Sequence, residues 1–174
     1  EVISVAAGFP TTVNPILQYG AVPVFVDIDV ATHNIDVTKI EAAISSKTKA
    51  IMPVHLYGHI AAMDRFAEIG KKHGVQIIED AAHAPYSKVN GKACGGIGDI
   101  GIYSFDAVKN LAVGEGGGIT TKDQGSADRA RALRYCGIKK SGFDNVTTGN
   151  NVNWWEYELS EPFIKMLPTN ISAS

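Results

Sequence analysis

The sequence predicts an α/β protein built on a doubly wound, mainly parallel β-sheet. Short runs rich in Val and Ile alternate along the chain with longer, amphipathic runs. Several of the short runs are apolar throughout, which is typical of parallel strands that are covered on both faces. The alternation of strands with helices is itself the pattern of a sheet whose strands are joined by helical crossovers.

The expected elements follow one another in regular order. We expect strands over residues 1–5, 23–27, 50–55, 76–80, 100–104 and 118–121, and helices over 11–19, 36–45, 62–73 and 124–136. The helix over 62–73 illustrates the reasoning. It has Met63, Phe66 and Ile69 on one face and the pair Lys71 and Lys72 near its end, shortly before Gly74, and cations followed by glycine are favourable at a helix C-terminus.

Composition excludes several classes of protein. The 174 residues are 45% hydrophobic and 20% charged with a formal net charge of −2, so we expect a globular protein without a nucleic-acid or membrane partner. Cys94 and Cys136 belong to no metal-binding or redox pattern, which fits the cytoplasm and predicts no metal site. We find no apolar run of transmembrane length.

The two ends of the chain indicate a fragment. The chain begins at Glu1, within an expected strand and without an initiator Met, and its last residues form no recognisable cap. We therefore expect a domain that is truncated at both ends. Residues 1–138 are expected to form its core, and residues 139–174 are expected to form a mobile loop and the start of a link toward a C-terminal small domain.

A glycine-rich stretch, "GIGDIG" at 96–101, matches the G-x-G-x-x-G pattern of dinucleotide-binding proteins. That pattern binds a phosphate only when it follows a strand and opens a helix. Here it precedes the strand expected over 100–104. A glycine-rich turn is therefore the favoured interpretation, and a flavodoxin-type or Rossmann-type nucleotide site is disfavoured.

Two neighbouring acids raise the first question of function. Glu79 and Asp80 follow an apolar run, and His83 comes three residues after Asp80. Either the acids form a solvated strand end, or one carboxylate lies at the sheet edge where α/β proteins bind ligands. Because side chains alternate along a strand, Glu79 and Asp80 are expected on opposite faces.

The stretch from Ser104 to Gly118 raises the second question. Lys109 follows the end of an expected strand, lies among the apolar residues of "FDAVKNLAV" and precedes a glycine cluster. A surface lysine is usually only solvated. A partly buried lysine, however, more readily offers a neutral amine as a nucleophile, and glycines allow the backbone to approach a cofactor closely.

Four blocks of sequence, in this order, resemble the sugar aminotransferases of the DegT/DnrJ/EryC1/StrS family: "EVISVAAGFPTTVNPILQYGAVPVFVDID", "TKAIMPVHLYG", "EDAAHA" and "GDIGIYSFDAVKNLAVGEGGG". The resemblance covers nearly the whole chain and is weakest over 139–160. It implies the large cofactor-binding domain of the aspartate-aminotransferase fold (fold type I), with pyridoxal 5′-phosphate (PLP) as cofactor.

The resemblance also implies a role for five residues. Lys109 stands where the family attaches the cofactor, and Asp80 stands where a carboxylate pairs with the pyridine nitrogen. His83 matches a position beside the cofactor's ring oxygen, Ser104 a hydroxyl that binds its phosphate, and Phe9 an aromatic that stacks on its ring. A core or capping histidine, a strand-end cap and a core aromatic remain open for His83, Ser104 and Phe9.

Two positions depart from the family pattern. The family's phosphate cradle, a helix start made of small residues, is expected before residue 1. Leu167 stands where many members carry an Asn that reaches the cofactor of the neighbouring subunit, so no role is carried over to it.

The implied activity is transfer of an amino group, from glutamate, to a nucleotide-linked keto-deoxy sugar in polysaccharide or amino-sugar biosynthesis, by a homodimer. The N-terminal block is also similar to the family's dehydratases, which have histidine in place of the lysine, so Lys109 favours transamination. A PLP-dependent sugar dehydratase and a keto-cyclitol aminotransferase remain alternatives. A catalytically silent regulatory or binding domain is a further alternative, although loss of Lys109 or Asp80 would be its sign.

Overall fold

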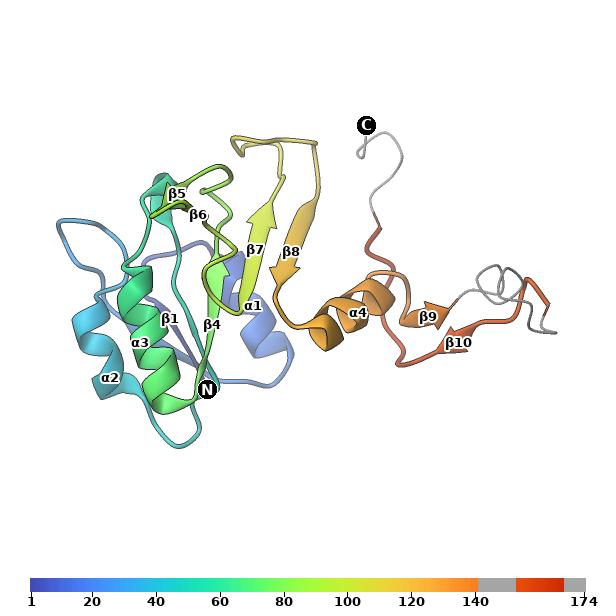
Figure 1. Ribbon diagram of the computed structural model, residues 1–174, viewed down its shortest axis with the longest axis horizontal. Helices are drawn as coiled ribbons and strands as arrows, with labels where there is room; N and C mark the ends of the chain where they lie inside the picture. Colours follow the sequence, from blue (N-terminus) through green and yellow to red (C-terminus); the bar gives the residue numbers. More distant parts are fainter. Residues whose placement is uncertain (141–152, 168–174) are drawn as a thin grey trace. The chain divides into compact units, whose positions relative to one another are not determined.

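A computed structural model describes residues 1–140 and 153–167, which fall into two compact units divided between Thr120 and Thr121. The first unit contains the main sheet and its helices (Figure 1). Its elements in chain order are β1 (Val2–Val5), α1 (Pro10–Gln18), β2 (Pro23–Val26), the 3₁₀ turn η1 (Val37–Lys39), α2 (Ile40–Ala43), β3 (Ala50–Met52), the 3₁₀ turn η2 (Leu56–Gly58), α3 (Met63–His73), β4 (Gln76–Asp80), β5 (Lys88–Val89), β6 (Lys92–Ala93), β7 (Ile100–Ser104) and β8 (Gly117–Thr121).

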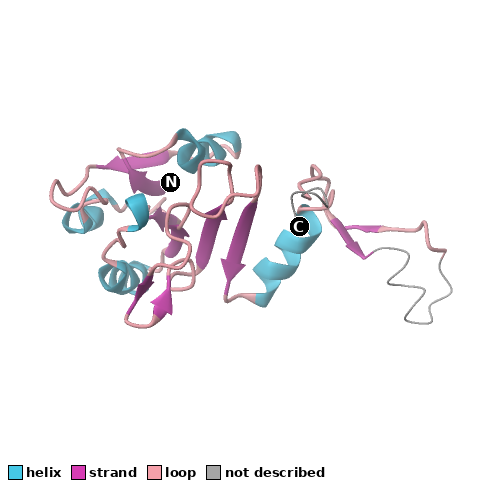
Figure 2. Cartoon of the chain, turned by 90° about the horizontal axis from the view of Figure 1, so that it is seen from above, coloured by secondary structure: helices cyan, strands magenta, loops and turns pink. Residues whose placement is uncertain are grey.

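The main sheet confirms the predicted fold class. Its six strands lie in the order β2-β1-β3-β4-β7-β8, and the first five are parallel. Strand β8 runs opposite to β7 (Figure 1). The chain moves from β1 outward to β2 and then back past β1 to β3. Because crossovers are right-handed, this reversal places α1 on one face of the sheet and α2 and α3 on the other (Figure 2).

All six predicted strands and the four predicted helical segments are present; β4 and β7 have the predicted bounds, and the ends of the others are shifted. Strand β3 stops at Met52 rather than residue 55, because Pro53 has no N–H to continue the ladder. Helix α4 (Gln124–Leu133) ends before residue 136, where it was predicted to end, and Cys136 and Gly137 then take positive φ values of 59° and 78°. The β5–β6 hairpin was not predicted.

The core lies mainly between the sheet and α3. Ile3, Ile51 and Phe66 are fully buried and belong to one apolar cluster with Met63 and Ile69 of α3. The predicted apolar face of α3 therefore lies in the same core as β1 and β3, and α3 also packs against β4. Full burial of side chains of this size stabilises the fold by about 1.5–3 kcal/mol each.

A fully buried carboxylate, that of Glu79 on β4, joins three separate segments of the first unit. Its Oε1 accepts hydrogen bonds from the backbone N–H groups of Ile97 at 2.7 Å and Gly98 at 2.6 Å. Its Oε2 accepts from the Gly95 N–H at 2.9 Å and from His55 Nε2 at 3.0 Å. Burial alone would raise the pKa of Glu79, but the hydrogen bonds from His55 and the backbone outweigh it and lower that pKa.

The "GIGDIG" stretch is thus a glycine-rich turn before β7, as predicted, and its N–H groups hold an internal carboxylate. A Cβ on Gly98 would lie 2.7 Å from the Ile77 carbonyl oxygen, and a Cβ on Gly101 would overlap the backbone of Gly95. Glycine is required at these two positions because the backbones of the turn, β4 and β7 approach so closely.

The second unit contains α4 (Gln124–Leu133) and a short antiparallel pair, β9 (Ile138–Lys140) and β10 (Glu158–Leu159). Asp123 caps α4 by accepting the Ser126 N–H at 2.6 Å. The segment predicted to contain a mobile loop begins at residue 139, but Lys139 and Lys140 are part of β9, and residues 141–152 lie outside the described residues. Among the described residues, no helix combines the length and apolar character needed to cross a bilayer.

We predict that Glu79→Gln destabilises the protein by about 2–4 kcal/mol. A glutamine amide has one acceptor oxygen where the carboxylate has two. The NH₂ group would therefore take the place of one carboxylate oxygen and face the buried N–H donors that this oxygen now accepts. Each unsatisfied buried donor costs about 1–3 kcal/mol. Urea unfolding measures the change.

Glu68→Gln is the matched control for this substitution. The Glu68 side chain is 66% exposed and, among the residues that the structure describes, pairs only with Arg65, so its loss should change the free energy of unfolding by less than about 0.5 kcal/mol. Equal effects of the two substitutions would contradict a structural role for Glu79.

Candidate active site

The residues singled out in the sequence lie at one edge of the main sheet. Phe9 follows β1, Asp80 and His83 end and follow β4, and Ser104 and Lys109 end and follow β7. These three strands are parallel, so their carboxyl ends meet at the same edge. From β1 the chain first adds β2 on one side and then crosses back to add β3 on the other. The point between β1 and β3 is therefore a topological switch point, where ligands of α/β proteins bind.

Asp80 is a buried carboxylate with acceptor capacity to spare. It is 8% exposed, its Oδ2 accepts from Thr12 Oγ1 at 2.7 Å, and its Oδ1 accepts from the Ala82 N–H at 3.1 Å. An ionised carboxylate can accept about four hydrogen bonds. In the described part of the chain Asp80 forms no ion pair, so a cationic ligand would find an acceptor here.

His83 is influenced by charged residues from the ends of both β4 and β7. The pKa of His83 is lowered, first by burial and then by the positive charge of Lys109, while the charge of Asp80 acts in the opposite direction. The imidazole is therefore held mostly neutral at physiological pH. It also stacks on the ring of Tyr57, with ring centroids 5.9 Å apart and planes within 3°.

The loop after β7 orders Ser104 and Lys109. The Asp106 N–H donates to Ser104 Oγ at 3.4 Å, and the Lys109 N–H donates to the Asp106 carbonyl at 2.9 Å. Ser104 thus caps the strand end, as its alternative interpretation expected, and its own O–H can still donate to a ligand. Lys109 is partly buried, as predicted, although neighbouring Val108 is 85% exposed.

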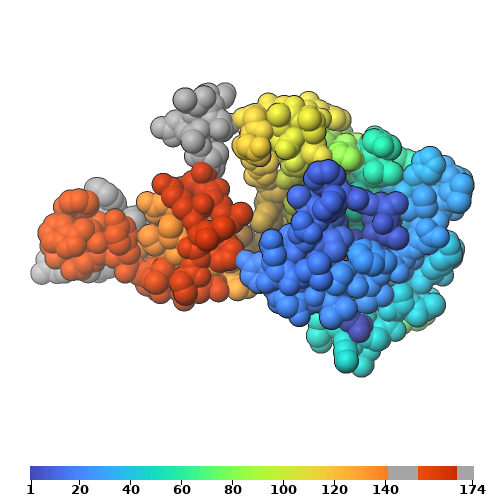
Figure 3. Space-filling view, turned by 180° about the vertical axis from the view of Figure 1, so that it is seen from behind, coloured from blue at the N-terminus to red at the C-terminus, as the bar shows by residue number. Residues whose placement is uncertain are grey.

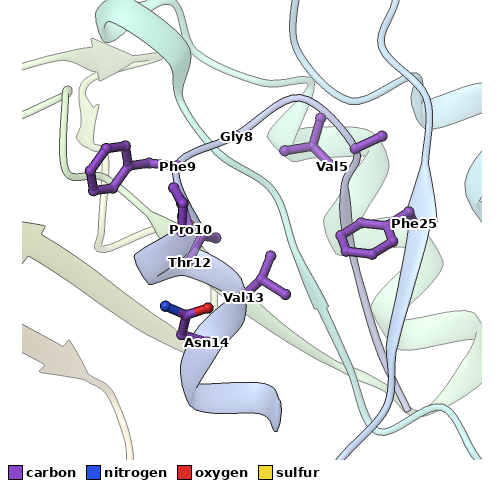
Figure 4. Close-up of a pocket in the computed structure, with 9 residues that line it drawn as sticks. Val5, Gly8, Phe9, Pro10, Thr12, Val13, Asn14 and Phe25 are labelled. Atoms are coloured by element: carbon purple, nitrogen blue, oxygen red, sulfur yellow. The ribbon is translucent and has the colours of Figure 1, made fainter.

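Phe9 differs from the other four residues because its side chain is exposed. Its side chain is 67% exposed, so it is not the core aromatic that was left open as an alternative. It lies at one end of a cavity of about 260 Å³ that has Phe25 at the other end and Thr12, Val13 and Asn14 of α1 between them (Figure 4). Seen from the side of α1, N-terminal residues form the foreground surface of the first unit (Figure 3).

A second cluster of side chains has atoms that could bind a metal, but those of His55 and Glu79 are already hydrogen-bonded. His55, Glu79 and Cys94 are buried, with donor atoms within 4.8 Å of one another. Both carboxylate oxygens of Glu79 accept hydrogen bonds, and His55 Nδ1 accepts the Ala61 N–H at 3.2 Å. Burial, followed by the nearby charge of Glu79, raises the pKa of the Cys94 thiol to about 11. Hydrogen bonding therefore accounts for this cluster.

Sequence reasoning missed the roles of four residues that shape the site. Thr12 and Asp80 are 68 positions apart, so no local pattern could pair them. Glu79 was given no task beyond facing away from Asp80, and His55, its partner, was read only as the end of a strand. Tyr57 carried a usable signal, because an aromatic followed by glycine between two elements is typical of a tight turn.

The geometry can now be compared with known proteins. The DegT/DnrJ/EryC1/StrS aminotransferase family matches residues 1–158. The chain belongs to this family. Its mainly parallel sheet is that of the fold type I aminotransferases, as predicted, and the family depends on PLP.

Individual relatives of this aminotransferase family are similar over most of the chain. It is 41% identical over 174 residues to the spore coat polysaccharide biosynthesis protein SpsC of Bacillus subtilis, covering all of this chain and 44% of that protein. It is 44% identical over 138 residues to GDP-perosamine synthase of Caulobacter vibrioides, covering 79% of this chain and 37% of that one.

A solved structure supports the same conclusion about the fold. The PLP form of the putative sugar aminotransferase Spr1654 from Streptococcus pneumoniae has a TM-score of 0.82 and 31% identity, over 99% of this chain and 46% of that one. The chain therefore spans less than half the length of the family members it matches.

We predict that Thr12→Val destabilises the protein by about 1–2 kcal/mol, because it removes a hydroxyl donor from a buried carboxylate while preserving shape. Thr11→Val, at the exposed neighbouring position, should change the free energy of unfolding by less than about 0.5 kcal/mol. Thr12→Ser should restore most of the loss, and urea unfolding of the three variants measures these differences. A Thr12→Ser variant as unstable as Thr12→Val would show that the methyl group, not the hydroxyl, matters.

Proposed function

We propose that the protein is a PLP-dependent aminotransferase that moves an amino group from glutamate to a nucleotide-linked keto-deoxy sugar. The observation that carries this proposal is the buried carboxylate of Asp80, which forms no ion pair among the described residues. The charges of Asp80 and Lys109 both act on the pKa of His83, so the three residues belong to one electrostatic environment. Sugar chemistry is supported by the relatives named for polysaccharide and GDP-perosamine biosynthesis, and the latter name supports a nucleotide-linked sugar.

The residues present fit PLP. A protonated pyridine nitrogen is a cation that Asp80 lacks, and a phosphate could accept the free O–H of Ser104. The neutral His83 would lie beside the ring oxygen, and the exposed ring of Phe9 would stack on the cofactor. When bound, PLP supplies an electron sink for the carbon from which a proton is removed.

Each residue then has a defined task. Asp80 would keep the pyridine nitrogen protonated through charge pairing, and Thr12 would hold the Asp80 carboxylate in place. Lys109 would bind the cofactor, take the proton from the donor's α-carbon as general base and later return a proton as general acid. A lysine can do this because its amine is able to cycle between the neutral and the charged form.

The wider assignment belongs to the same proposal. Residues 1–138 would form the core of the cofactor-binding domain, and residues 139–174 would lead toward a small C-terminal domain. The protein would act as a homodimer. It would act in the cytoplasm, because the free thiols of Cys94 and Cys136 fit a reducing compartment. The presence of Lys109 is evidence against a dehydratase, and the presence of both Lys109 and Asp80 is evidence against a silent regulatory domain.

We predict that borohydride reduction of the intact protein with PLP attaches the phosphopyridoxyl group to Lys109. Peptide mass mapping locates the label. Lys88 and Lys92, which are exposed on the β5–β6 hairpin, serve as internal controls and should stay unlabelled. A label on either of them, with Lys109 unmodified, would remove the site assignment.

We predict that Asp80→Asn keeps the fold, because the amide oxygen can accept the Ala82 N–H while the NH₂ group donates to the Thr12 hydroxyl, but lowers the rate of amino transfer about 10²-fold or more. This is the size of effect expected when an active site loses one group that stabilises charge. Asp64→Asn, at an exposed position in the first turn of α3, is the control and should leave the rate unchanged. Rates equal to wild type for Asp80→Asn would exclude Asp80 as the partner of the ring nitrogen.

A further inference from the structure

The orientation of His83 is set by a turn that follows a different strand. The η2 turn comes after β3, and the backbone N–H of Tyr57 in this turn donates to His83 Nδ1 at 3.4 Å. The Tyr57 ring lies parallel to the imidazole. Two contacts from one residue therefore fix both the plane of the His83 ring and the environment of one of its nitrogens.

Tyr57 makes these contacts from an unusual backbone conformation. Its φ and ψ are 53° and 25°, in the left-handed region that a non-glycine residue seldom occupies. The turn is fastened on the His83 side, where Ser87 Oγ donates to the Gly58 carbonyl at 3.2 Å, and on the other side, where the Leu56 N–H donates to Asn34 Oδ1 at 3.1 Å. Strained conformations held in this way gather at functional sites.

Core packing does not account for the Tyr57 side chain. It is 85% exposed, so burial of apolar surface contributes little to its position. The ring contact that it makes is with His83. A large aromatic side chain held over an imidazole at the edge of a candidate site has the arrangement of a residue that positions that imidazole.

The contact to Nδ1 also determines where the imidazole carries its proton. A backbone N–H can only donate, so Nδ1 must be unprotonated, and the proton of a neutral ring must then lie on Nε2. In the described part of the chain the His83 ring makes no other hydrogen bond, so its Nε2–H is the donor that remains for a ligand.

We propose that Tyr57 is a positioning residue that holds His83 in its Nε2–H tautomer and in a single plane, so that the imidazole donates a hydrogen bond to the ring oxygen of the cofactor. This inference rests on the proposed function for the identity of the ligand. The contact between Tyr57 and His83 is itself independent of that function.

The first experiment measures the tautomer directly. Nitrogen-15 NMR of the imidazole groups in the intact protein, without PLP and at a pH where His83 is neutral, distinguishes protonated from unprotonated ring nitrogens, and His83→Gln identifies the signals. We expect a proton on Nε2 and none on Nδ1. Tyr57→Gly, which suits a positive φ, should move the His83 signals toward an average of several ring states. A proton on Nδ1 in the wild type would overturn the proposal.

The second experiment asks whether Tyr57 acts through His83. PLP titration of the wild type, Tyr57→Gly, His83→Ala and the double variant forms a double-mutant cycle. We expect Tyr57→Gly to weaken PLP binding about 10-fold in the wild type but less than about 2-fold when His83 is already Ala. Tyr57→Phe, which keeps the stacked ring, should bind PLP within about 2-fold of the wild type.

The outcomes separate the two proposals. Equal weakening by Tyr57→Gly in both backgrounds would show that Tyr57 contacts the cofactor or acts on the fold generally, and would overturn the positioning role. If the wild type takes up no PLP and Lys109 stays unlabelled, the proposed function fails. The NMR experiment then still decides whether Tyr57 sets the His83 tautomer.

Discussion

The buried carboxylate of Glu79 is the interaction on which the rest of the first unit depends. An ionised group without water loses several kcal/mol of solvation, and only a full set of donors offsets that loss. Glu79 obtains its donors from His55 after β3 and from the turn before β7. Removing any one donor leaves charge less compensated, so the carboxylate holds these segments in one arrangement.

The same constraint gives Asp80 its place. Because side chains alternate along β4, a Glu79 fixed toward the glycine-rich turn directs Asp80 to the opposite face, where it meets Thr12 of α1. Two adjacent carboxylates thus have different states. The donors around Glu79 occupy both its oxygens, whereas Asp80 accepts two hydrogen bonds and retains capacity for a cation. Glu79 therefore stabilises the fold, whereas Asp80 retains the capacity to accept further hydrogen bonds.

The strands and the position of Asp80 at the sheet edge could be predicted, because they depend on local sequence patterns. Alternating apolar runs predicted the strands, and the order of strand and helix predicted the edge at which Asp80 lies. The hairpin β5–β6 could also have been predicted, since Asn90 and Gly91 form the Asn-Gly pair of a two-residue turn and both have positive φ. The pairing of Glu79 with His55 could not, because it joins residues 24 positions apart whose approach depends on the register of β3 and β4.

The glycine-rich turn shows why a motif must be judged by its position. Its closely spaced N–H groups form an anion site of the same physical kind that binds phosphates in nucleotide-binding proteins. Since the turn enters β7 instead of a helix, no helix N-terminus adds to it, and the anion that it holds is the carboxylate of Glu79. Glycine is needed at Gly98 and Gly101 for a different reason, because the turn and β7 lie so close to the backbones of Ile77 and Gly95. The turn is linked to Asp80 only indirectly, through the placement of β4.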